Sequence, residues 1–299
     1  MALQITIDIF SGRENPVIEL TGKEAEEAIK HLKPGKKIKK GEMGLPPAPT
    51  LGYRGLVIEQ TGKIEKDLPK VFRLAHGDMF GTNLAHRAAD EDFEKFICES
   101  TGPIKKLDLS KETLKYILNE IDRFRDIRVK WPWDGKITWP LTDPCKCAPL
   151  YEPDWWNDGD KKQLHNNCYN YATNYRTDTF RAVNGGGQPG AAADARYTEM
   201  TCASVIPAAV KDNLIDKPSA NNRCPGEGHL VALVMSPNRD FHWYRKGRNG
   251  YWSHKPGSTP VTNLDNSGIT IEDPRFTDRG SYTDFCTFMV VMHGHVKIK

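Results

Sequence analysis

The sequence of 299 residues has no long apolar run, little net charge and no internal repeat. Its mean hydropathy is -0.60, and no stretch approaches the roughly 18 apolar residues that cross a bilayer. We therefore expect no membrane-spanning helix. The 42 Lys and Arg residues barely exceed the 39 Asp and Glu residues. This surplus is too small to indicate a nucleic-acid-binding protein.

Disorder of the whole chain is excluded, because 38% of the residues are hydrophobic and 25 more are glycine, a normal share for globular proteins. A length of 299 residues predicts two domains at roughly 150 residues each. The start, MALQITIDIF, alternates apolar with polar side chains and lacks the basic stretch and cleavage site of a signal peptide. We expect it to form a strand.

Residues 1–130 have the pattern of a small α/β domain, and the sequence assigns it no role. Thr21 with Glu24 fits a capping box at a helix start. Ser110 fits the N-cap of a helix that reaches Asp126, with apolar residues three or four positions apart. Strands are expected at Leu3–Phe10, Val17–Leu20, Tyr53–Glu59 and Val71–Leu74, and another helix at Glu91–Ser100.

The composition changes near residue 130, where a segment rich in tryptophan, proline and glycine opens the second domain, residues 131–299. Its tryptophans are Trp131, Trp133, Trp139, Trp155 and Trp156. We expect Trp155, Trp156 and Trp243 to form a substrate platform, whereas the alternative is that the tryptophan cluster packs the two domains together. A helix is expected from about Asn167, and strands at Leu230–Met235, Phe241–Arg245, Tyr251–His254 and Phe285–Met292.

Cys168 stands at the expected start of that helix, with Asn167 as the N-cap. Unpaired N–H groups in the first turn and the helix dipole lower the pKa of such a thiol and can hold an oxyanion. The position therefore predicts a nucleophile. The alternative is a buried or disulfide-bonded cysteine, because free cysteines are among the most buried residues.

Two histidines follow on predicted strands. His229 opens an apolar run 61 residues after Cys168, and His242 lies 13 residues further, on the next strand. A thiol, an imidazole and a third orienting side chain form the arrangement that nucleophilic catalysis requires.

The order of these residues resembles the NlpC-type and CHAP-type amidases of the papain-like superfamily, over residues 163–245. The resemblance implies an α+β protein whose papain-like C-terminal domain packs a Cys-bearing helix on an antiparallel sheet. It also implies Cys168 as nucleophile, His229 as base and His242 as orienting residue, with a peptide or peptidoglycan-like substrate. The sequence departs from the family in a long insertion between Cys168 and His229.

A second resemblance rests on NNCYNYATNYRTDTF together with FHWYR, YWSHKPG and NLDNSG. These segments resemble a block shared by bacterial proteins of unknown role and the insoluble shell-matrix proteins of bivalve molluscs. The block covers most of the chain from Asp154 onward. It implies an extracellular setting and names no reaction.

Further residues are candidates for a supporting role. Gln163 and Asn167 are candidate oxyanion donors, and Asp265 or Asn266 is a fallback orienting residue that alternatively forms a turn. His254 competes with His242. A two- or four-residue hairpin loop places the two histidines on opposite sheet faces, and only a three-residue loop joins them. We expect just one of them in the site.

Seven cysteines are an odd number, so at least one thiol lacks an intrachain partner. Cys145-Lys-Cys147 lacks a second ligand pair at zinc spacing, which favours disulfide use, and His293-Gly-His295 is expected at the surface. We expect no metal and no cofactor. If Cys168 is the free thiol, six cysteines remain for disulfides of open connectivity, namely Cys98, Cys145, Cys147, Cys202, Cys224 and Cys286.

Two functions follow from these patterns. The leading hypothesis is a cysteine-dependent amide hydrolase or acyl transferase, a peptidase or amidase acting on cell-wall peptides. The alternative is a non-catalytic secreted matrix or carbohydrate-binding protein stapled by disulfides. Both predict a secreted or extracytoplasmic protein without a nucleic-acid partner, and the oligomeric state stays open.

Overall fold

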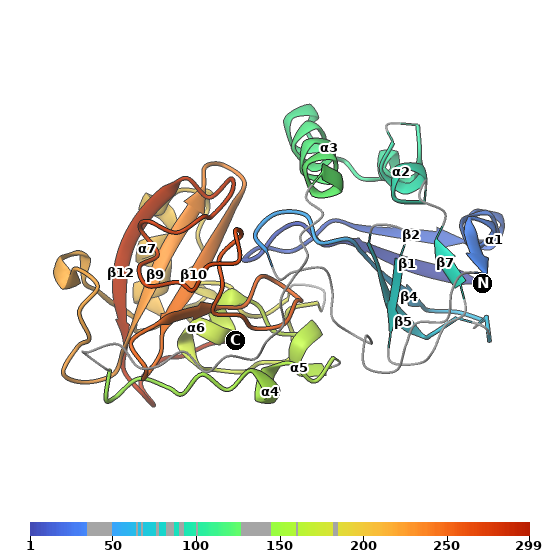
Figure 1. Ribbon diagram of the computed structural model, residues 1–299. Coiled ribbons are helices and arrows are strands. Elements are labelled where there is room, and N and C mark those ends of the chain that lie inside the picture. Colours follow the sequence, from blue (N-terminus) through green and yellow to red (C-terminus); the bar gives the residue numbers. More distant parts are fainter. Residues whose placement is uncertain are drawn as a thin grey trace. The chain divides into compact units, whose positions relative to one another are not determined.

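The computed structural model describes residues 1–34, 50–63, 65–66, 68–75, 78–81, 87–89, 93–99, 101–126, 145–159, 161–181 and 185–299. Trp131, Trp133 and Trp139 lie outside these residues. The chain forms two compact units (Figure 1). The first contains Met1–Ile9, Asn15–Ala48 and Tyr53–Val129, and the second contains Phe10–Glu14, Pro49–Gly52 and Lys130–Lys299. Helices and antiparallel sheets occur in both, which confirms the α+β class.

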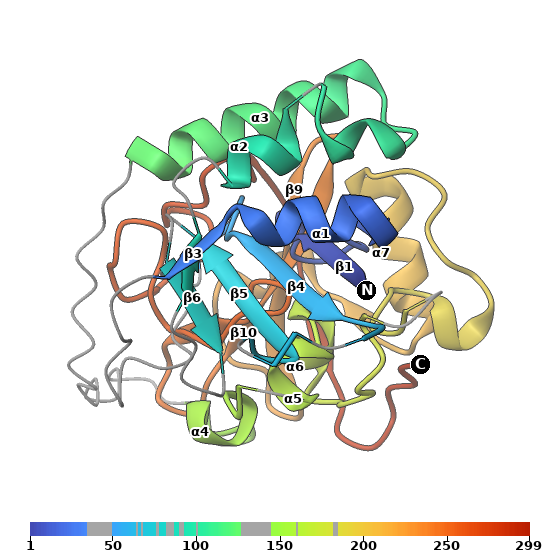
Figure 2. The same ribbon diagram turned by 90° about the vertical axis from the view of Figure 1, so that its right-hand side faces the viewer.

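The N-terminal unit is built on an antiparallel sheet in the order β2-β1-β4-β5-β6, with a small sheet of β3 and β7. Its strands are β1 (Ala2–Ile7), β2 (Val17–Thr21), β3 (Leu32–Pro34), β4 (Leu56–Gln60), β5 (Val71–Ala75), β6 (Asp78–Gly81) and β7 (Arg87–Ala89). Its helices are α1 (Gly22–Lys30), α2 (Phe93–Cys98), the 3-10 turn Pro103–Lys106 and α3 (Lys111–Asp126). Helix α1 buries Ala25, Ala28 and Ile29 and packs on β1 and β2 (Figure 2).

Of the two helix caps predicted in this unit, one is confirmed and the other is wrong. The Ser110 hydroxyl accepts a hydrogen bond from the Thr113 N–H at 3.2 Å, as a cap of α3 should. The capping box at Thr21 is wrong, because its side chain makes no cap hydrogen bond. The first strand also ends earlier than predicted, at Ile7, and Phe10 belongs to the other unit.

The C-terminal unit has an antiparallel sheet in the order β11-β10-β9-β12-β8. Its strands are β8 (Ile215–Asp216), β9 (His229–Ser236), β10 (Asp240–Lys246), β11 (Trp252–His254) and β12 (Asp284–Val291). Its helices are α4 (Pro153–Trp156), α5 (Lys161–Leu164), α6 (Cys168–Thr173) and α7 (Cys202–Lys211), with 3-10 turns at Ala191–Ala193 and Pro218–Ala220. Helix α7 was not predicted, and it contains Pro207.

Each face of this sheet is covered. Side chains alternate along a strand, so Val231 and Leu233 of β9 share one face, where α6 packs against β10 and α7 against β12 (Figure 1). Leu230 and Ala232 point to the other face, where they pack with Trp252 and with loop residues. The strands are therefore buried on both sides, which explains the continuous apolar run of β9.

A buried charge cluster lies in the N-terminal unit. The carboxylate of Asp8 contacts Arg54 Nη2 at 2.7 Å and Arg73 Nη1 at 2.6 Å, and all three side chains are buried. Burial raises the pKa of Asp8, but the two guanidinium groups outweigh it and lower that pKa to about 2.

Replacing Asp8 with Asn should lower the free energy of unfolding of the N-terminal unit by about 3–5 kcal/mol, because two buried cations lose their partner. Urea unfolding of the full chain measures this. The exposed Asp108→Asn is the control and should change little. The contribution of Asp8 is present above pH 3.8 and should be lost as the pH falls to about 2. An unchanged midpoint for Asp8→Asn would contradict this.

Candidate functional site

Helix α6 begins at Cys168, as predicted, and Asn167 is its N-cap. The Asn167 side-chain oxygen accepts hydrogen bonds from the N–H groups of Tyr169 at 3.0 Å and Asn170 at 3.1 Å. The Asn170 side-chain oxygen in turn accepts from the Asn167 N–H at 3.1 Å. This complete capping box fixes the start of the helix. It also occupies two of the first-turn donors that we expected to face a thiolate or an oxyanion.

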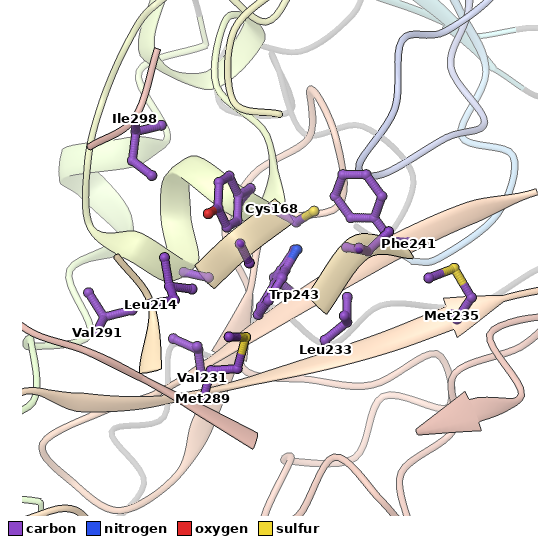
Figure 3. Close-up of a cluster of buried hydrophobic side chains, with 14 residues drawn as sticks. Cys168, Leu214, Val231, Leu233, Met235, Phe241, Trp243, Met289, Val291 and Ile298 are labelled. Atoms are coloured by element: carbon purple, nitrogen blue, oxygen red, sulfur yellow. The ribbon is translucent and has the colours of Figure 1, made fainter. Parts of the chain in front are cut away.

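The thiol of Cys168 lies inside the core instead of in a cleft. Cys168 is fully buried, and Figure 3 shows its sulfur beside the rings of Phe241 and Trp243. Burial and the negative charge of Asp240 raise the pKa of the Cys168 thiol far above its ordinary value, although Lys255 opposes this shift. Our expectation that the start of the helix lowers the pKa of the Cys168 thiol was therefore wrong. The group stays a neutral thiol, which is a poor nucleophile.

His229 lies on the same sheet face as Cys168, but its two ring nitrogens bond to other groups. Its Nε2 is 2.7 Å from the carbonyl oxygen of Ala172, and its Nδ1 is 3.1 Å from Nε2 of His293. An Nε2–H that donates to the carbonyl leaves Nδ1 to accept from His293. Both ring nitrogens are thus occupied without the thiol. Burial lowers the pKa of His229 to about 3.

His242 lies on the opposite face of the sheet from His229. It pairs with Val234 across β9 and β10, and Val234 belongs to the cluster on the far side from Cys168. Cross-strand partners share a face. The structure therefore does not bring Cys168, His229 and His242 together as a nucleophile, a base and an orienting residue.

His254 corrects a second expectation. The register pairs Tyr244 with His254, so the hairpin follows the odd-loop alternative and places His254 on the face of His242. Nε2 of His242 lies 2.8 Å from Nδ1 of His254. The two imidazoles form one buried pair, whereas we expected only one of them in the site.

The other candidate polar residues hold loops. Asp265 accepts from the N–H groups of Ser267 and Ile269, both at 2.9 Å, which confirms it as a turn former. Asn266 bonds the N–H and the carbonyl of Leu51. The buried Gln163 accepts at its backbone oxygen from Lys255 Nζ at 2.5 Å. None of these contacts orients a histidine.

The tryptophan platform reduces to one exposed ring. Trp156 and Trp243 are buried within the C-terminal unit, which excludes them from a platform, and Trp155 is 49% exposed. Lys162 Nζ lies 4.6 Å and the Arg176 guanidinium carbon 5.2 Å from the centre of the Trp155 ring. Cations over the ring hold it in place.

Two disulfides cross-link the C-terminal unit, Cys145–Cys224 and Cys202–Cys286. Cys147 is exposed, outside a disulfide, so the predicted disulfide use of the Cys145-Lys-Cys147 pair holds for Cys145 alone. Cys98 and Cys168 are buried and also outside the disulfides. Within the described residues no group of three or more His, Cys, Asp or Glu is arranged to hold a metal ion.

One buried carboxylate holds a loop that is distant in sequence, a contact that was not predicted. The fully buried Asp240 accepts hydrogen bonds from the backbone N–H groups of Ser11 at 2.5 Å and Arg13 at 3.0 Å, from that of Gly12 at 3.2 Å, and from the Tyr282 hydroxyl. Burial raises the pKa of Asp240, and these donors oppose the rise. Because 227 to 229 positions separate the partners, no local pattern predicts the contact.

Two side-chain amides complete this contact. Asn167 Nδ2 and Gln188 Nε2 donate to the carbonyl oxygen of Gly12 at 2.9 and 2.7 Å. A Cβ on Gly12 would lie 2.3 Å from the Phe241 ring and 2.6 Å from the Phe241 carbonyl oxygen, so only glycine fits. We call residues Phe10–Glu14 the loop segment. We call the residues that hold it the loop socket, namely Asn167, Gln188, Asp240, Phe241 and Tyr282.

The C-terminal unit is thus a disulfide-bonded α+β domain whose buried polar groups bind one another. Of the described residues, none belongs to a helix long and apolar enough to cross a membrane. No family model matches the chain, and no solved structure does. The chain is 44% identical over 147 residues to insoluble matrix shell protein 1 of Ruditapes philippinarum, a match that covers 48% of this chain and 91% of the relative. The chain belongs to the family of that protein, which bears out the shell-matrix resemblance.

Alkylation of the native protein should modify Cys147 rapidly and leave Cys168 intact until the chain unfolds, because only Cys147 is exposed. Peptide mapping by mass spectrometry distinguishes the two. Cys147→Ser should abolish the fast phase and Cys168→Ser should keep it. Fast modification of Cys168 would restore the nucleophile hypothesis.

The ring of His229 should stay neutral in the folded protein between pH 8 and about 3, and NMR of its ring signals measures this. In the unfolded chain His229 binds a proton near pH 6.5, whereas in the folded chain it stays neutral down to about pH 3. The contribution of His229 to stability is therefore full above pH 6.5 and falls as the pH drops toward 3. A folded-state titration near pH 6 would contradict the buried geometry.

Proposed function

We propose that this chain is a non-catalytic protein of an insoluble extracellular matrix, with a C-terminal unit that serves as a rigid, disulfide-bonded binding module. The observation that carries the proposal is the burial of Cys168, together with the bonds that His229 makes to Ala172 and His293. Burial also raises the pKa of the Cys168 thiol. A cysteine hydrolase needs an ionised or activated thiol. The family relation to a matrix protein of a shell supports the same role.

The two disulfides support an extracellular setting, because disulfides persist in oxidising compartments. They join residues 79 and 84 positions apart, so each restricts a long loop of the unfolded chain. A protein that stays for long in a solid matrix benefits from this resistance to unfolding. The setting also agrees with the secreted localisation that the sequence predicted.

Trp155 is the side chain that we propose for binding the matrix. It stands on the short helix α4, half exposed, with the exposed Asp154 next to it in sequence. A held aromatic face stacks on the apolar face of a sugar ring, and neighbouring charged groups bond its hydroxyls. An insoluble polysaccharide is the matrix component that fits this surface.

Sedimentation with insoluble polysaccharide tests the proposal, with chitin and peptidoglycan as probes and calcite as a mineral comparison. Trp155→Ala should weaken binding to polysaccharide about fivefold, since a stacked ring contributes on the order of 1 kcal/mol. Phe276→Ala is the matched control, because Phe276 is 82% exposed and lies in another loop. Equal binding by wild type and Trp155→Ala would contradict the assigned surface.

A separate cleavage assay tests whether the protein is catalytic. Wild type and Cys168→Ser should both leave peptidoglycan peptides and unrelated peptides uncleaved, with no release of amines. Cleavage by wild type that Cys168→Ser abolishes would overturn the non-catalytic role.

A further inference from the structure

Two histidine rings meet at one end of the C-terminal sheet. His229 is the first residue of β9 and is fully buried, and it pairs with Val291, the last residue of β12. His293 lies two positions beyond Val291 and is exposed. Nδ1 of His229 is 3.1 Å from Nε2 of His293, and the ring centres are 5.2 Å apart. A buried imidazole nitrogen therefore faces an imidazole at the protein surface.

The other ring nitrogen of His229 fixes its orientation. Nε2 lies 2.7 Å from the carbonyl oxygen of Ala172, the residue of α6 beside it. Because a carbonyl can only accept, Nε2 carries the hydrogen and the lone pair is on Nδ1. Histidines that bind metal ions donate their second ring N–H to a backbone carbonyl in this way, which sets the tautomer and holds the ring. The His229 ring is thus preorganised to offer Nδ1 as a ligand.

The separation of the two nitrogens fits two ligands of one ion. Zn²⁺ binds imidazole nitrogen at about 2.0–2.1 Å, so two such nitrogens are about 2.9 Å apart at a right angle and about 3.3 Å apart at the tetrahedral angle. The observed 3.1 Å lies between these values. On binding, His293 gives up the proton on Nε2 and carries one on Nδ1 instead. Solvent can exchange these protons, because the His293 side chain is exposed.

The surroundings favour an ion that prefers nitrogen ligands. Imidazole suits Zn²⁺, Cu²⁺ and Ni²⁺, whereas Ca²⁺ and Mg²⁺ take oxygen ligands. The positive charge of Arg245 acts on His229 and opposes a cation there, although its guanidinium is held by the Tyr171 carbonyl at 3.1 Å. Among the described residues no third His, Cys, Asp or Glu completes the set. Water or a ligand from another molecule therefore fills the remaining coordination positions.

We propose that His229 and His293 form an open binding site for a divalent transition-metal ion of the class that imidazole binds. The sequence led us to expect no metal, because it contains no paired ligand motif, and this pair joins residues 64 positions apart. The site does not depend on the proposed matrix function.

Calorimetric titration of the metal-free, untagged full chain with Zn²⁺ tests the site. A Cys147→Ser parent removes the exposed thiol, which is itself a zinc ligand. His293→Ala should weaken the tightest binding event about tenfold or more, since loss of a group that merely orients a ligand already costs that much. His295→Ala is the matched control, because His295 is exposed in the same segment, and it should bind as the parent does. Equal affinity of the parent and His293→Ala would overturn the proposal.

NMR of the histidine ring nitrogens locates the ion in the same protein. Zn²⁺ should shift the signals of His229 and His293 and leave those of the buried pair His242 and His254 in place. Ca²⁺ at the same concentration should shift none of them, because it prefers oxygen ligands. Zn²⁺ shifts confined to other histidines would overturn the site, and so would shifts of His229 and His293 that Ca²⁺ reproduces.

Discussion

The carboxylate of Asp240 is the buried charge on which the C-terminal unit depends. It lies at the start of β10, fully buried, where an isolated anion is costly. Three backbone N–H groups of the loop segment and the Tyr282 hydroxyl solvate it in place of water. This requirement ties residues near the N-terminus to the sheet. Burial raises the pKa of the Cys168 thiol, and the nearby Asp240 carboxylate raises it further.

The second sheet face follows the same principle of internal pairing. His254 donates through Nε2 to the carbonyl of Leu264 at 3.0 Å, so its Nδ1 accepts the bond from Nε2 of His242 at 2.8 Å. Tyr244 stacks on His254 with ring centres 4.9 Å apart. A separate network outside this face centres on Lys255, which donates to three backbone carbonyls, among them that of Gly257 at 2.7 Å. Buried polar networks of this kind rigidify a core, which suits a structural module.

Local chemistry made part of this architecture predictable from sequence. The Asn167 cap and the β9 strand after Gly228 depend on neighbours within a few residues, and both were located within about a residue. The register of the β10–β11 hairpin could not be predicted, because it depends on whether the loop has an odd or an even number of residues. The number of loop residues decides on which face of the sheet His254 lies. The burial of Cys168 depends on residues of β10 and β12, which no short pattern contains.

Ionisation of the Cys168 thiol most directly tests the proposal that this unit is a non-catalytic module. Cys168 labelled with carbon-13 at Cβ reports thiol and thiolate through its chemical shift as the pH rises. A signal that stays at the thiol position from pH 6 to pH 9 is the predicted result. A thiolate that appears below pH 8 in the folded protein would contradict the account.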